Sequence, residues 1–209
     1  MATEFQSQTL QELSDIRKLM QRSSRFLSLS GLSGVAAGVC GLCGAYAAVA
    51  IIDARSKAHA GIDTDGGLEN SLMLLGGVVF IAALSLAFLF TWKRAKRINL
   101  PVWDLAARNL LWNLAVPLLA GGLFILSLIY NGDWEYISPA CLVFYGLGLV
   151  NASKYTVSDI RYLGYLEIVT GLLNLWMPAY AVYFWAAGFG VLHIVYGLVM
   201  WAKYEKDEQ

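Results

Sequence analysis

Long apolar stretches alternate with short polar segments along most of the chain. Six such stretches lie at about residues 29–52, 72–92, 110–130, 137–152, 162–177 and 182–201. An α-helix rises about 1.5 Å per residue, so a stretch of roughly 20 residues crosses the hydrocarbon core of a bilayer. The pattern predicts an all-α polytopic membrane protein with six transmembrane helices arranged as three hairpins.

The last predicted hairpin, residues 162–201, is the most informative part of the chain. Glu167 and His193 are its only acidic or basic side chains, apart from tyrosine hydroxyls, and Pro178 separates its two arms. Ionisable groups inside a membrane are costly, so they are expected to face other helices and to find a partner there. The two residues are therefore the first candidates for chemistry.

Residues 1–25 differ from the rest because they are polar. Thr9 and Glu12 fit a capping box, and apolar residues follow at three- and four-residue steps from Leu10 to Met20. This pattern predicts an amphipathic helix that lies on the membrane surface or binds a protein partner; the alternative is a solvated leader. The predicted organisation is a leader at 1–25, a transmembrane domain at 26–202 and a charged tail at 203–209.

The basic residues are sorted by loop. Of the 15 Lys and Arg residues, all except Arg55 and Lys57 fall in the leader, in 93–108, in 153–161 or after residue 201. Lys and Arg collect on the cytoplasmic side of membrane proteins. The sequence therefore predicts that both termini are cytoplasmic.

Composition narrows the function classes. The chain is 58% hydrophobic, is 14% charged and has a net charge of zero, so we expect a lipid bilayer and no nucleic acid as its partner. Three cysteines and two histidines are too few for a multi-histidine metal or haem site, and no catalytic motif is present. The Cys40-Gly-Leu-Cys43 spacing also occurs in redox and metal sites, but packing explains it more simply. We expect no enzyme activity, no cofactor and no metal.

Glycines mark one face of the first apolar stretch. Gly34, Gly38 and Gly41 recur at three- and four-residue spacing. Small residues at this spacing let another helix backbone approach closely. The pattern predicts that this face packs against a neighbouring helix, and association of two copies of the chain is a further expectation.

A polar site is predicted in the inner half of the bundle. Glu167 and Asn174 share a face of the fifth stretch, while His193 lies at a similar depth on the sixth. Asn113 and Asn151 lie in the same inner half. Together these five residues predict a polar cavity that opens to the cytoplasm and binds a ligand or a proton, closed on the outer side by Trp176, Tyr183, Phe184 and Trp185. The alternative is that the polar side chains only cross-link helices by hydrogen bonds.

Two repeating patterns accompany the site. The segment from Tyr145 to Tyr155 is echoed by the segment from Tyr196 to Tyr204, which agrees with repeated hairpins around a threefold axis. The run from Gly171 to Pro178, with the aromatic and glycine-rich helix after it, resembles the HdeD family of small six-span bacterial membrane proteins. This resemblance implies a stress or acid-resistance protein of the bacterial inner membrane without known catalytic residues.

Two classes of function follow from these patterns. The first is a non-enzymatic inner-membrane protein that acts as an accessory, sensory or stress-related subunit through its leader and tail. The alternative is a small-solute or proton-coupled transporter or channel that uses the cytoplasm-facing polar cavity. A contact between Glu167 and His193 inside the bundle is the geometric requirement of the second class.

Overall fold

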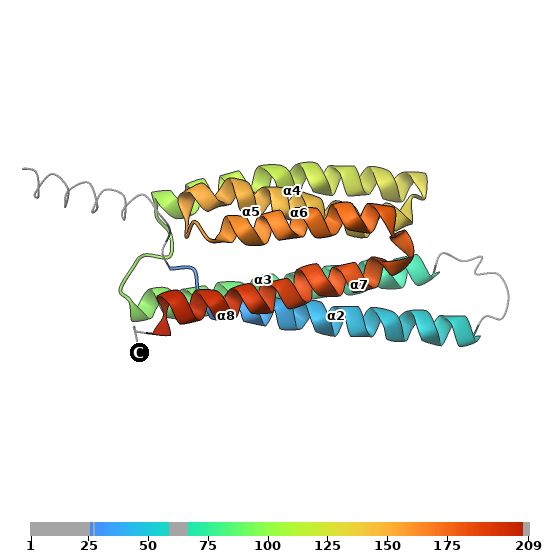
Figure 1. Ribbon diagram of the computed structural model, residues 1–209, viewed down its shortest axis with the longest axis horizontal. Helices are drawn as coiled ribbons and strands as arrows, with labels where there is room; N and C mark the ends of the chain where they lie inside the picture. The colour runs from blue at the N-terminus through green and yellow to red at the C-terminus, as the bar shows by residue number, and fades with distance from the viewer. Residues whose placement is uncertain (1–25, 27, 59–66, 207–209) are drawn as a thin grey trace, which may run out of the picture.

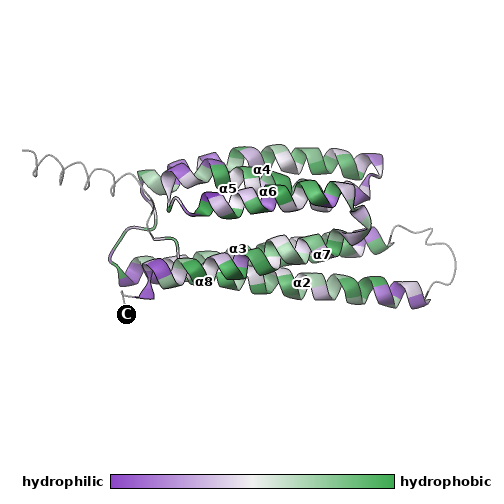
Figure 2. Cartoon of the chain, in the orientation of Figure 1, coloured by the Kyte–Doolittle hydropathy of each residue, from purple (hydrophilic) through white to green (hydrophobic). Residues whose placement is uncertain are grey.

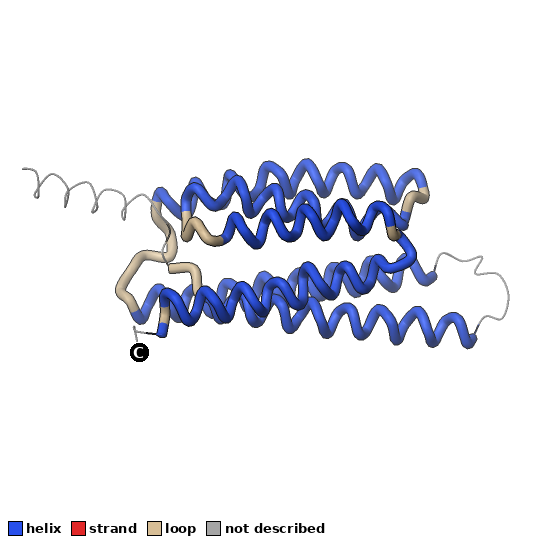
Figure 3. The backbone as a smooth tube through the Cα atoms, in the orientation of Figure 1, coloured by secondary structure: helices blue, strands red, loops and turns tan. Residues whose placement is uncertain are grey.

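The computed structural model describes residues 26, 28–58 and 67–206, and this part of the chain is helical with no strand (Figure 3). Its main helices are α2 (Gly31–Ala58), α3 (Gly67–Arg97), α4 (Leu105–Asn131), α5 (Ile137–Ala152), α6 (Ile160–Trp176), α7 (Ala181–Trp185) and α8 (His193–Tyr204). Short 3₁₀ turns are η1 (Trp134–Tyr136), η2 (Ser153–Tyr155) and η3 (Pro178–Tyr180), and η4 (Ala186–Leu192) is a π-helix. The predicted leader helix, residues 1–25, lies outside the described residues.

Five helical runs of the described chain are long and apolar enough to cross a membrane. They are α2, α3, α4, the run Trp134–Tyr155 around α5, and the run Pro178–Tyr204 that contains α7, η4 and α8. Figure 2 shows hydrophobic residues along the middle of the bundle and hydrophilic residues gathered at its two ends. These lengths and this distribution are those of a multi-pass helical membrane protein.

The helices form two layers of three (Figure 1). One layer holds α4, α5 and α6, with α5 packed against both neighbours; the other holds α3, α2 and α8, with α2 in the middle. The predicted hairpins α2–α3 and α4–α5 are therefore formed. The two arms of the third predicted hairpin pack less closely on each other, because α6 packs mainly on α5 and α8 mainly on α2, while α6 also contacts η4 and α7. The arrangement consequently has two layers rather than a threefold axis.

The glycine face of α2 lies against the last helical run. A Cβ atom added at Gly38 would lie 2.7 Å from the carbonyl oxygen of Gly190 and 2.6 Å from the Ile194 side chain. At Gly34 the nearest atom is the Gly197 Cα, 3.2 Å away, and a Cβ at Gly41 would meet the carbonyl of Phe189. Only a helix without side chains at these positions can approach so closely. The structure thus places the three glycines in the seam between α2 and the run η4–α8.

Helix α3 lies at an edge of its layer. Its buried residues, Thr91, Arg94 and Ala95, all lie in its last two turns, and its most apolar stretch has none. Atoms added at Gly76 or Gly77 would meet no described residue within 4 Å. Most of α3 therefore faces the surroundings of the bundle, which in a membrane protein is lipid.

One end of the bundle, which we call the basic end, carries the segments 93–108 and 153–161. Here Glu205, just after α8, folds back and is buried. Its carboxylate accepts hydrogen bonds from the Gly31 amide and from the Ser30 hydroxyl (3.1 Å), and lies 3.6 Å from the Arg94 guanidinium. Arg94 also donates to the carbonyls of Leu29 and Tyr204. The acid satisfies the free N-terminal amide of α2 and joins the ends of α3 and α8 to it.

The two layers are also tied to each other at the basic end. The Phe26 amide donates to the Tyr155 carbonyl (2.7 Å), and the Thr156 hydroxyl donates to the Phe26 carbonyl (2.7 Å). Lys203 on α8 donates to Asp159, which precedes α6. The segment that enters α2 and the last turn of α8 therefore hold the α4–α5–α6 layer against the other layer.

Candidate functional site

Glu167 and His193 meet at the boundary between the two layers. Glu167 is on α6, His193 is the first residue of α8, and the distance from Oε1 of the acid to Nδ1 of the ring is 3.3 Å. Their exposed fractions are 0% and 5%. Glu167 lies seven residues into α6, or about 10 Å from its start. The contact predicted between these two residues is present.

The hydrogen bonds of His193 identify its tautomer. Nδ1 lies 3.0 Å from the carbonyl oxygen of Gly188, and Nε2 lies 2.8 Å from the hydroxyl of Tyr145 on α5. A carbonyl can only accept, so the proton of the neutral ring is on Nδ1. Nε2 then accepts a hydrogen bond from Tyr145. The ring is thereby fixed by one bond to its own helical run and by one bond across the layer boundary.

The carboxyl group of Glu167 is far less well satisfied. Neither of its oxygens has a hydrogen-bond partner among the described residues, because Nδ1 of His193 is directed to Gly188. A buried carboxylate without donors is strongly disfavoured, so this arrangement favours the neutral acid or a charged pair with the imidazole. An unsatisfied buried acid beside a histidine is a common property of functional sites.

Gly188 makes room for this carboxyl group. A Cβ atom at position 188 would lie 2.6 Å from Oε2 of Glu167 and would also clash with the Leu142 side chain. Gly188 belongs to the π-helix η4, a form of helix that is rare and often found at functional sites. Substitution of Gly188 by alanine is therefore incompatible with the observed position of the acid.

Aromatic rings enclose the pair on one side. The ring centroid of Tyr145 lies 5.4 Å from that of His193 and 5.3 Å from that of Phe189, and Phe189 in turn packs on Trp185 at 4.6 Å. Such apolar surroundings strengthen electrostatic interactions because they screen charge poorly. A change of protonation at the pair will consequently act strongly on its neighbours.

Asn174 lies two turns beyond Glu167 on the same face of α6. Its side-chain nitrogen donates to the Ser138 hydroxyl on α5 (2.9 Å), and Ser138 donates to the Ala181 carbonyl (3.3 Å). Asn174 is fully buried, and its Oδ1 has no hydrogen-bond partner in the described chain. This second polar contact ties α5, α6 and the start of α7 together.

The other predicted site residues lie elsewhere. Asn151 donates to the Asn113 carbonyl (2.9 Å), and Asn113 donates to Asn109 within α4 (2.8 Å). These bonds link α5 to α4, and neither asparagine is bonded to Glu167, Asn174 or His193 in the described structure. The expected outer closure also differs, because Trp176 and Tyr183 are 88% and 69% exposed and point away from the bundle.

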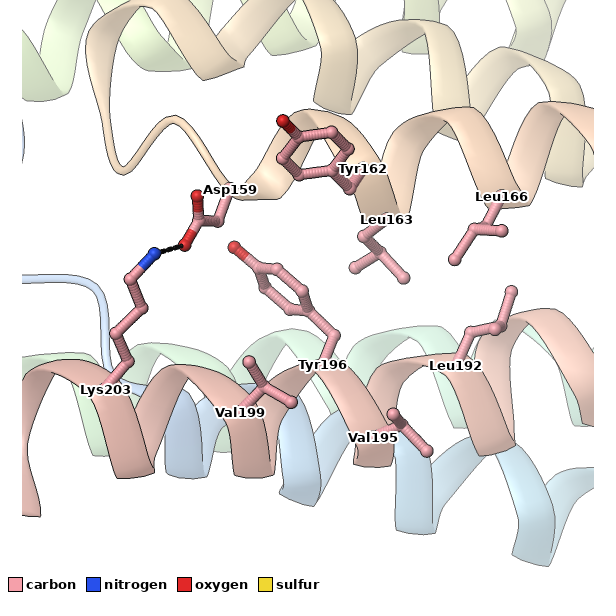
Figure 4. A pocket seen from close by; sticks show the side chains of 9 residues that line it. All are labelled: Asp159, Tyr162, Leu163, Leu166, Leu192, Val195, Tyr196, Val199 and Lys203. Atoms are coloured by element: carbon pink, nitrogen blue, oxygen red, sulfur yellow. Dashed lines mark hydrogen bonds and ion pairs between the residues drawn. The ribbon is translucent and has the colours of Figure 1, made fainter.

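A pocket of about 370 Å³ lies between α6 and α8 near the basic end (Figure 4). It is lined by Asp159, Tyr162, Leu163, Leu166, Leu192, Val195, Tyr196, Val199 and Lys203. Leu166 and Leu192 are the chain neighbours of Glu167 and His193, but the acid and the imidazole do not line the pocket themselves. The pocket and the buried pair are therefore separate features at the same layer boundary.

Sequence reasoning missed three residues that complete the site: Tyr145, Gly188 and Ser138. A signal existed for the first, because Tyr145-Gly146 echoes Tyr196-Gly197 and both tyrosines face the layer boundary. Gly188 was hidden among the many glycines of the last helical run. Nothing in the pattern identified Ser138 as the partner of Asn174.

No family model matches this chain, and neither the search of curated proteins nor that of solved structures found a match.

Proposed function

We propose that this protein is a six-span, non-enzymatic protein of the bacterial inner membrane that serves as a sensory or accessory subunit and responds to protons. The observation that carries the proposal is the fully buried Glu167 carboxyl group, which has no hydrogen-bond partner among the described residues and lies 3.3 Å from His193. The acid and the imidazole belong to different helix layers. A change in the protonation of either group therefore alters the contact between the two layers.

The proposed sixth span is α6. Its 17 residues extend about 25 Å, close to the thickness of a bilayer core, and it packs along α5, which belongs to one of the five runs long enough to cross a membrane. The distribution of Lys and Arg supports a cytoplasmic basic end, and the resemblance to the HdeD family supports a bacterial, stress-related role.

Two acceptors compete for the Nδ1 proton of His193. The Gly188 carbonyl lies 3.0 Å away and Oε1 of Glu167 lies 3.3 Å away. When the acid is neutral, Nδ1 stays with Gly188. When the acid loses its proton, a buried charge needs a donor, and the nearest donor is this Nδ1–H. A proton thus switches His193 between its own helical run and α6, which makes the pair a two-state element.

The Asp159–Lys203 pair at the basic end does not switch between two states in this way. The hydrogen bond from Lys203 holds the pKa of Asp159 below its usual value. A carboxyl group of this kind stabilises the fold above its unfolded pKa of about 3.9, and the contribution is lost as the pH falls further. The Asp159–Lys203 pair is therefore silent between about pH 5 and 8, so a response of the protein in this range would come from another group.

Hydrogen–deuterium exchange in nanodiscs tests the proposal. For the native protein, exchange of peptides from α6 and from the run η4–α8 is expected to change between pH 5 and 8, after correction for intrinsic exchange. Glu167→Gln keeps the shape of the side chain and removes its charge, so the change is expected to disappear. Glu135→Gln, at an exposed position, is the matched control and is expected to behave as native. A native-like response in Glu167→Gln would contradict the proposal.

Proton-coupled transport is the second candidate function. Glu167 and Asn174 present, on one face of α6, buried oxygens that have no hydrogen-bond partner in the part of the chain that the structure describes, and such acceptors also serve as proton or solute sites in transporters. In liposomes with an internal pH-sensitive dye, a transporter would show a proton flux that Glu167→Gln abolishes. If the exchange response is present without any flux, the sensory function is retained and transport is rejected.

The proposed orientation gives a labelling prediction. In a variant with Cys40, Cys43 and Cys141 replaced by alanine, a single cysteine at the exposed position Asn70 is expected to react with an impermeant maleimide in intact cells. A single cysteine at Leu100, which is exposed at the basic end, is expected to react only after the cells are opened. The reverse pattern would show that the basic end is outside.

A further inference from the structure

We propose that the pocket between α6 and α8 binds one acyl chain of an anionic phospholipid, with the headgroup at the basic end. The inference is independent of the protonation of Glu167 and His193. It rests on the shape and lining of the pocket, on a hydroxyl in its wall that has no hydrogen-bond partner among the described residues, and on the cations near its mouth.

The main part of the pocket is lined by apolar side chains. Leu163 and Leu166 on α6 face Leu192, the last residue of η4, and Val195 and Val199 on α8 (Figure 4). The space exists because α6 packs mainly on α5 and α8 packs mainly on α2, which leaves room between these two helices. In a bilayer, an apolar space at this position is filled by hydrocarbon rather than by water. Its volume of about 370 Å³ is near the lower end for ligand pockets, so it suits one acyl chain rather than a whole lipid molecule.

The mouth of the pocket is polar. Tyr162, Tyr196, Asp159 and Lys203 lie at the basic end, where Figure 4 shows the Tyr196 hydroxyl directed toward Asp159. The Tyr196 hydroxyl is buried and has no hydrogen-bond partner in the described chain. A buried hydroxyl without a partner is costly, and an ester or phosphate oxygen of a lipid would accept its proton.

The charges at the mouth select the headgroup. Arg161 does not line the pocket but donates to the hydroxyl of Tyr162, which does (3.0 Å); with Lys203 it contributes two positive charges against the one negative charge of Asp159, and Lys203 remains 55% exposed while paired with Asp159. The net positive charge lies where α6 begins and α8 ends, at the level of the lipid headgroups. Basic residues at a membrane surface favour anionic lipids by about 1 kcal/mol each. The occupant is therefore an anionic lipid of the leaflet at the basic end.

Native mass spectrometry with phosphatidylglycerol and phosphatidylcholine tests the inference on the delipidated full chain. The native protein is expected to bind one phosphatidylglycerol saturably and phosphatidylcholine more weakly. Lys203→Gln is expected to weaken phosphatidylglycerol binding about fivefold, since it removes one cation. Lys154→Gln, at an exposed position, is the control and is expected to leave binding unchanged.

Variants that fill the pocket give a more direct test of lipid binding at this site. Val199→Trp places an indole in the pocket and is expected to abolish the saturable site, whereas Val78→Trp on the exposed face of α3 is expected to bind as native. Tyr196→Phe keeps the shape of the pocket and removes the hydroxyl, so it tests the site if Val199→Trp does not fold. Native binding by Val199→Trp and Tyr196→Phe, or equal binding of both lipids, would overturn the inference. Glu167→Gln is expected to bind lipid as native, which separates this result from the proton response.

Discussion

Replacing Glu205 by alanine is expected to lower the free energy of unfolding by about 3 kcal/mol. This residue lies after the last helix, where a charged side chain is ordinarily solvated. Here its carboxylate is buried against the Arg94 guanidinium and the first amide of α2. Alanine would remove the buried carboxylate that contacts the Arg94 guanidinium and would leave the Gly31 amide without this acceptor. We place the loss at the low end for a broken buried pair because the site lies at the end of the bundle.

Two further variants separate charge from hydrogen bonding. Glu205→Gln retains an acceptor for the Gly31 amide but not the charge, so we expect an intermediate loss of stability. Lys206→Ala changes the next residue, which is exposed, and is expected to have no effect. Thermal unfolding of the purified protein in detergent, followed by intrinsic fluorescence, measures all three. Equal stability of Glu205→Ala and Lys206→Ala would show that the buried contacts contribute nothing.

The helices could be predicted because apolar length and polar breaks depend on local sequence. Pro178 and the Asn131–Asp133 turn mark chain reversals that the structure also has. The layers could not be predicted, because every apolar stretch can pack on every other. The third hairpin was expected from adjacency in the chain, whereas glycines on α2 draw α8 away from α6.

The candidate site shows the same difference between what the local sequence predicts and what only the packing of the helices determines. Glu167 and His193 could be paired by counting turns from the ends of their helices, since two buried ionisable groups at similar depth seek each other. Depth alone also grouped Asn113 and Asn151 with them, but those residues lie on the α4–α5 side. Glu205 acts through contacts with residues far apart in the sequence, which no local pattern reveals. Glu205 looked like part of a charged tail for this reason.

Substitution of Gly38 by leucine is expected to lower the free energy of unfolding by about 1 to 3 kcal/mol. Even a single Cβ atom at this position would lie 2.7 Å from the Gly190 carbonyl, an atom of the backbone that cannot rotate away. The helices α2 and α8 must therefore separate or shift to admit the side chain. Gly38→Ala is expected to have a smaller effect in the same direction.

Gly77→Leu is the matched control, since it places the same side chain in the middle of a helix of the same layer. No described residue lies within 4 Å of a Cβ atom at Gly77, and leucine favours helix more than glycine by up to about 1 kcal/mol. We therefore expect Gly77→Leu to be as stable as the native protein or more stable. Denaturant unfolding of both variants in the same detergent measures the difference. If the two leucines have equal effects, close approach at Gly38 does not stabilise the bundle, and the seam between α2 and α8 must be held by its side chains alone.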